Sequence, residues 1–144
     1  MNALQLKAFN ALVSDHQDSL YNVAFHAIGD EESAVVTTQA AIQTAYQTLG
    51  SLQTSSIRLW LLRSLVMQCR KYYRNRTNPP QKQPLDLQSC LASLPLELCL
   101  VITLVDLEGL DYDQAAAVLN EPRRQVIKRL AQARQKLVEN MPVH

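Results

Sequence analysis

Apolar positions in the first half of the chain recur three and four residues apart, which is the spacing of amphipathic helices. One stretch ends near Gly29, Asp30 can cap the next stretch, and a third covers about residues 57–74. Their apolar rows are Leu12, Leu20, Val23, Ala24 and Ala27; Val35, Thr38, Ile42, Ala45 and Leu49; and Ile57, Leu61, Leu65, Cys69 and Tyr72. The pattern predicts three helices that form a small bundle.

Shorter helices follow in the second half. Pro95 can open a helix that carries the apolar run 98–107 and ends at Gly109. Asp111 and Gln114 have the spacing of a capping box for a short helix through residue 119. A proline at position 122 opens the last helix, whose apolar row is Val126, Leu130, Ala133 and Leu137. No alternating strand pattern is present, so the predicted fold class is all-α.

A proline-rich stretch separates the two halves. Residues 75–84 contain three prolines and no aliphatic residue, so they cannot continue a helix. The sequence therefore predicts a first helical module over residues 1–76, a linker over 77–87 and a second helical module over 88–144.

Charge is distributed in blocks that the net charge of +1 conceals. Residues 1–50 hold five acids and one base, and residues 51–83 hold seven bases and no acid. Residues 84–121 hold seven acids and no base, and residues 122–144 hold six bases and one acid. Each module therefore ends in a basic helix. The acidic block is also expected to dock on the basic helix of the first module.

Enzymatic and membrane signals are sparse in these 144 residues. The three cysteines form no CxxC pair, no metal-ligand or nucleophile motif is present, and no cofactor is expected. The uncharged stretch 33–57 is rich in Gln and Thr, so it is not expected to span a membrane. The N-terminus lacks a signal-peptide pattern. We therefore expect a soluble, cytoplasmic, non-enzymatic protein.

Two of the predicted helices form a helix-turn-helix. A short helix over 112–119, a tight turn and a helix opening at residue 122 have the layout of a motif that places its second helix in the major groove. Candidate DNA contacts near the start of that helix are Arg123, Arg124, Gln125, Lys128 and Arg129. The alternative is an ordinary helical hairpin with a solvated basic face.

Basic residues also line the third helix of the first module. Arg63, Arg70 and Arg74 share one stripe, with Trp60 and Met67 beside it. Charge that follows a backbone and rings that stack on bases suit a single DNA strand. The candidate contacts are Trp60, Arg63, Arg70, Lys71 and Arg74. The alternative places the tryptophan in the core and leaves the arginines solvated.

Several segments resemble bacterial sigma factors. Those that resemble region four are Leu94-Pro95, residues 108–116, Val126, Arg129-Leu130, Ala133-Arg134 and Leu137. Those that resemble region two are Ala34, Gln39, Ala45, Tyr46, Trp60-Leu61, Tyr72 and Arg74. The most similar group is the extracytoplasmic-function (ECF) group, which keeps only these two regions.

The resemblance implies partners and sites. In this family, region two grips the β′ clamp of RNA polymerase and captures unpaired −10 bases, while region four sits on the polymerase flap and reads the −35 element. The implied polymerase-binding residues are Val36, Gln39, Ala40 and Gln43. The implied partners are promoter DNA and core RNA polymerase. An anti-sigma protein and a second copy of the chain stay open as further partners.

Some positions depart from the family pattern. Val35, Val36 and Ala40 stand where acidic residues are usual, Met67 where Asn is frequent, and Ile127 where Lys is usual. A second hypothesis follows from these departures. It is a sigma-like regulator, either a DNA-binding protein or a protein-binding module, that no longer initiates transcription.

Overall fold

The computed structural model describes residues 3–48, 56–75, 91 and 94–140. Within these ranges the regular structure is helical and no strand occurs, so the all-α prediction is confirmed. The predicted linker over 77–87, Leu49 and Cys90 lie outside the described residues. The bounds predicted for the two modules therefore stay predictions, although helices fill the described parts of both.

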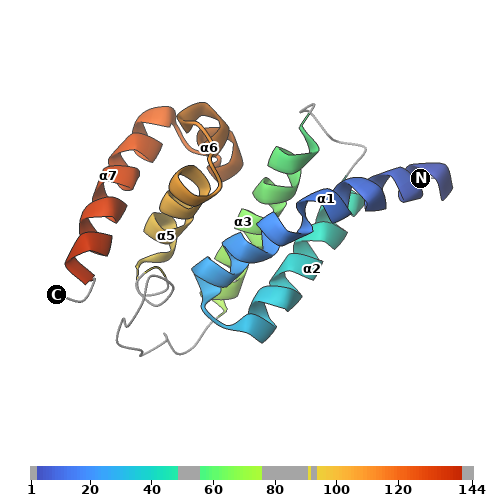
Figure 1. The fold of residues 1–144 in the computed structure, drawn as a ribbon, viewed down its shortest axis with the longest axis horizontal. Helices are drawn as coiled ribbons and strands as arrows, with labels where there is room; N and C mark the ends of the chain where they lie inside the picture. Colours follow the sequence, from blue (N-terminus) through green and yellow to red (C-terminus); the bar gives the residue numbers. More distant parts are fainter. Residues whose placement is uncertain (1–2, 49–55, 76–90, 92–93, 141–144) are drawn as a thin grey trace.

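The first module is a bundle of α1 (Ala3–Ile28), α2 (Glu31–Gln47) and α3 (Ile57–Arg74), drawn from blue to green in Figure 1. Asp30 caps α2 as predicted, because its carboxylate accepts a hydrogen bond of 2.9 Å from the Ser33 N–H. The Ser56 hydroxyl caps α3 in the same way, at 3.2 Å from the Leu59 nitrogen. The predicted bounds of the third helix are confirmed.

The buried face of α2 differs from the predicted one. Thr38 and Ala45 are buried as predicted, but Val35 is 41% exposed and Ile42 is only partly buried, so the predicted row is wrong at these two positions. The buried residues are Ala34, Thr37, Thr38, Ala41 and Ala45. These side chains are small, and the Ser64 hydroxyl of α3 donates to the Ala41 carbonyl at 2.7 Å. A hydrogen bond at this distance requires a close approach of the two helices, which small side chains permit and a Val–Ile row would hinder.

The first helix shows a similar correction. Leu12 is 44% exposed, whereas Phe9 and Val13 are buried. The ring of Phe9 packs edge-on against Tyr46 of α2, with centroids 5.4 Å apart. The aromatic contact explains why the buried face of α1 passes through Phe9 and not through Leu12.

The second module contains α5 (Leu96–Ile102), the π-helical turn η2 (Thr103–Leu107), α6 (Tyr112–Leu119) and α7 (Arg123–Asn140). Sequence periodicity predicted one continuous helix through the apolar run, and the π-helical turn is a correction to it. Gly109 ends the segment as predicted, with φ of +79°, a conformation that favours glycine. The turn directs Asp106 toward Arg134 of α7 and Glu108 toward Arg58 of α3.

The predicted capping box of α6 is confirmed. The Gln114 N–H donates to the Asp111 carboxylate at 2.7 Å, and the Asp111 N–H donates to the Gln114 side-chain oxygen at 3.0 Å. Asn120 ends α6 in the left-handed conformation, with φ of 56°. The chain can then turn directly into α7, which completes the helix-turn-helix.

The two modules pack against each other through α3 with α6 and through α1 with α5. Figure 1 shows α5 between α7 and the first bundle. The core is continuous, with buried apolar residues from both modules in one cluster. The acidic block therefore docks on the basic helix α3 as expected, with Glu97 and Glu121 against Arg70.

Candidate nucleic-acid and polymerase interfaces

The outward face of α7 is basic near its N-terminus. Val126 and Leu130 are buried against the rest of the module, whereas Arg124 and Lys128 are exposed. Because the two basic residues are four apart, they lie on one face, about one helical turn apart. Ile127 is 39% exposed beside them. The face follows directly on the turn of the helix-turn-helix, where such motifs approach bases.

The other predicted contacts of α7 point elsewhere. Arg123 lies over the Tyr112 ring, 5.5 Å from its centroid, and its Nε is 3.3 Å from the Asp113 carboxylate. Gln125 is partly buried. Arg129 turns toward the first module and pairs with Glu121, which lies in the turn between α6 and α7. The structure therefore leaves two of the five candidates, Arg124 and Lys128, on the outward face, with Arg123 at its margin.

The predicted stripe on α3 is also divided. Arg63, Lys71 and Arg74 are exposed, but Arg70 is engaged by the second module. Trp60 is partly buried, and its indole N–H donates to the Ala45 carbonyl of α2 at 3.4 Å. In this conformation the tryptophan supports the packing of α2 against α3.

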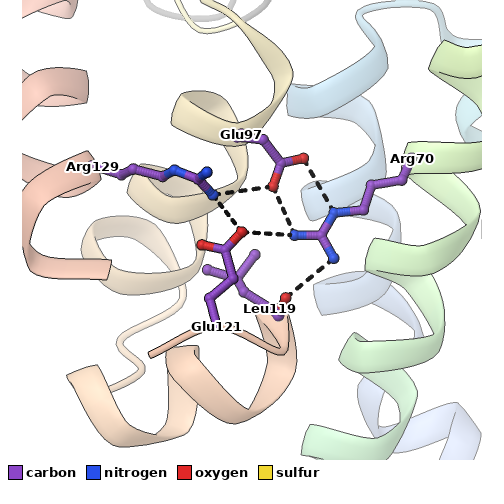
Figure 2. A network of polar contacts seen from close by, with 5 residues as sticks. All are labelled: Arg70, Glu97, Leu119, Glu121 and Arg129. Carbon is purple, nitrogen blue, oxygen red and sulfur yellow. Dashed lines mark hydrogen bonds and ion pairs between the residues drawn. The ribbon is translucent and has the colours of Figure 1, made fainter. Parts of the chain in front are cut away.

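Arg70 stands at the centre of a polar cluster between the modules (Figure 2). Its Nη2 and Nε donate to the two oxygens of Glu97 at 2.7 and 3.1 Å, which is a bidentate pair. Its Nη1 donates to the Leu119 carbonyl at 3.1 Å, and Glu121 lies 3.6 Å away. Hydrogen bonding to Glu97 is the largest cause that raises the pKa of this guanidinium. Arg129 reaches the same carboxylates from α7.

A second polar contact joins the modules at the other end of α3. Arg58 donates to the Glu108 carbonyl at 2.8 Å, and its guanidinium is 3.7 Å from the Glu108 carboxylate. The Ser19 hydroxyl of α1 donates to the same carboxylate. The sequence analysis assigned no contact between the modules to Arg58, Glu97, Glu108 or Glu121. The alternating charge blocks indicated which segments would meet, but no sequence signal paired individual residues.

The candidate polymerase-binding face lies on α2. Val36 is 60% exposed, Gln39 and Gln43 are exposed, and Ala40 is partly buried. Their spacing places the four residues along one side of the helix. No charged residue occurs after Glu32 in α2, so this face offers apolar and amide groups only.

The described residues contain no group of His, Cys, Asp or Glu side chains that could hold a metal ion. Cys69 and Cys99 are buried, and burial is the largest cause that raises the pKa of each thiol to about 12. Such thiols are poor nucleophiles at neutral pH. Among the described helices, none is both long and apolar enough to cross a membrane.

The match to a known protein family lies in the second module. Residues 85–137 match the family described as Sigma-70, region 4. The chain is 25% identical over 163 residues to the ECF RNA polymerase sigma factor SigE of Mycolicibacterium smegmatis. The alignment covers 96% of this chain and 63% of that protein, so the chain spans less than two thirds of the length of this relative.

Two solved structures share the arrangement. A chain from the co-crystal structure of the sigma factor RpoE with the anti-sigma factor NepR from Bartonella quintana matches with a TM-score of 0.75 at 22% identity, over 93% of this chain and 96% of that one. A chain from the structure of CnrH with the cytosolic domain of CnrY matches with a TM-score of 0.76 at 26% identity, over 93% and 87%. The second module thus matches the Sigma-70, region 4, family over its helix-turn-helix, and the chain as a whole is similar to sigma factors of the ECF group.

Proposed function

We propose that this protein initiates transcription as an ECF-type sigma factor, by binding promoter DNA and core RNA polymerase without any catalytic group of its own. The observation that carries the proposal is the exposed pair Arg124 and Lys128, which follows the turn of a capped helix-turn-helix. An arginine there can pair with a guanine edge, and a lysine can pair with a phosphate. This face is the candidate contact with the −35 element.

The α3 surface is the candidate contact with the unpaired −10 strand. Arg63, Lys71 and Arg74 are exposed and can follow a phosphate backbone. Trp60 and Arg70 belong to the proposed surface as well, but both have intramolecular partners in this conformation. They join the site only if those contacts are released.

The α2 face is the candidate contact with the polymerase clamp. Val36 and Gln39 are the exposed residues at its centre. The other proposed region of polymerase contact, with the flap, belongs to the helix-turn-helix module as a whole. We also propose that the chain is held by a protein of the anti-sigma kind, since the two solved structures described above are complexes and the partner in one of them is an anti-sigma factor.

Transcription with purified core polymerase tests the function. The protein should co-purify with core polymerase and direct it to discrete start sites on a library of genomic fragments. The double variant Arg124→Ala with Lys128→Ala should lose these start sites. The control Lys136→Ala removes an exposed base from the same helix, away from its N-terminus, and should keep them. Failure of the wild-type protein to bind core polymerase would refute the proposal.

A second candidate function is a sigma-like regulator that no longer initiates transcription. The observation in its favour is Val36, which is 60% exposed on a face without charge. If that face binds a basic clamp surface weakly, then Val36→Glu should strengthen polymerase binding in a pull-down assay. If the face serves another protein or a second copy, the same change should disrupt that complex, as light scattering would show.

A further inference from the structure

The contact between the modules engages one candidate DNA-binding arginine from each of them. Arg70 of α3 and Arg129 of α7 approach the same two carboxylates, Glu97 and Glu121, from opposite sides (Figure 2). The two arginine side chains are only 26% and 25% exposed. We name these four residues the Arg–Glu cluster. It engages Arg70 of the proposed −10 surface together with Arg129, which the sequence predicted as a −35 contact.

Each of the three guanidinium nitrogens of Arg70 donates a hydrogen bond. Nε and Nη2 hold Glu97, Nη1 holds the Leu119 carbonyl, and Nη2 also faces Glu121. A phosphate binds arginine through the same bidentate geometry as a carboxylate. A phosphate that binds the Nε and Nη2 side of Arg70 must therefore displace Glu97.

Other contacts hold the modules together beside the cluster. Arg58 binds Glu108 near the start of α3, twelve residues before Arg70, which is about 18 Å along the helix. The Cys99 thiol of α5 donates to the His26 carbonyl of α1 at 3.3 Å. The closed arrangement is thus fixed at both ends of α3, and only one of these ends lies among the predicted DNA contacts.

We propose that the Arg–Glu cluster is an intramolecular latch, which keeps the two modules closed and lowers the affinity for DNA until phosphates displace the glutamates. The proposal rests on the DNA-binding function above. The ion pairs of the Arg–Glu cluster are partly exposed, so each contributes modestly to the stability of the closed arrangement, and the modules can separate. An equilibrium of this kind reduces the apparent affinity by the fraction of molecules that are open.

The test neutralises the carboxylates without changing their shape. The latch variant carries Glu97→Gln and Glu121→Gln. The matched control carries Asp106→Asn and Asp113→Asn, which remove the same charge from ion pairs within the second module, with Arg134 and Arg123. Nitroxide labels on Gln47→Cys and Gln132→Cys, both exposed positions, report the distance between modules by pulsed electron paramagnetic resonance in a Cys90→Ser background. A mixed-sequence duplex of about 30 base pairs probes phosphate binding, which depends little on sequence.

The latch variant should show a broad, longer distance distribution, whereas the control should keep the wild-type distribution. The latch variant should bind the duplex about threefold or more tightly than the control does. The control is the right reference because it has lost the same negative charge, which by itself favours DNA binding. Wild-type protein should open when the duplex is added. Equal distances in the latch variant and the control would overturn the proposal, as would opening without a gain in affinity.

Two further results keep the inference separate from the function and from folding. If no variant binds the duplex, the proposed DNA-binding function fails, and regulation by the latch fails with it. If the distance between the modules still differs between the latch variant and the control, the cluster holds the modules together but does not regulate DNA binding. A second variant guards against misfolding: Arg70→Gln should keep the helical circular dichroism spectrum of the wild type and should open the modules as the latch variant does. A helical Arg70→Gln protein with closed modules would count against the latch.

Discussion

The capping box of α6 offers a sharp test of how the helix-turn-helix is built. The helix is only eight residues long, so its first turn is a large part of it. Asp111→Ala removes the acceptor that lies 2.7 Å from the Gln114 nitrogen. Loss of an N-cap acceptor costs about 1 kcal/mol, within a range of roughly 0.5–2 kcal/mol. For a chain of this size, the expected fall in Tm is about 2–4 °C.

Urea unfolding followed by circular dichroism would measure the loss. Asp113→Ala is the matched control, since it removes one acid from the same turn, but the Asp113 side chain is 81% exposed and its pairing with Arg123 contributes little. Asp111→Ser keeps an acceptor without the charge, so it should recover most of the lost stability. Equal destabilisation by Asp111→Ala and Asp113→Ala would refute the capping argument and assign the effect to charge alone.

Four further predictions concern the fold and the DNA face. Ser64→Ala should destabilise the protein by about 1 kcal/mol in urea unfolding, because the buried hydrogen bond from the Ser64 hydroxyl to the Ala41 carbonyl of α2 is lost. Asn120→Ala should cost about 1 kcal/mol and Asn120→Gly should cost less, since the residue has a positive φ. Peptide-resolved alkylation at pH 8 should spare Cys69 and Cys99 in native protein, and stability should fall between pH 9 and about 12, where only the unfolded thiols lose their protons. Ile127→Lys should steepen the salt dependence of DNA binding by roughly one phosphate contact.

Local sequence signals accounted for most of the helices. The cap at Asp30, the box at Asp111 and Gln114, and the stop at Gly109 act within three or four residues of themselves, so they are readable without the fold. Spacing alone was less reliable for the buried faces. Val35 fits a helical row as well as Ala34 does, and the distance between α2 and α3 decided in favour of the smaller residue.

The sequence by itself determined that the protein has two helical modules with a basic helix at the end of each, because helical periodicity, capping and charge blocks are properties of neighbouring residues. Only the tertiary structure decided which basic residues remain available. Arg70 lies 27 residues from Glu97 and 49 from Leu119 along the chain, and its environment depends on how the modules pack. Arg124 stays exposed for the same reason that Arg129 does not: the buried row of α7 directs one of them outward and the other toward the first module.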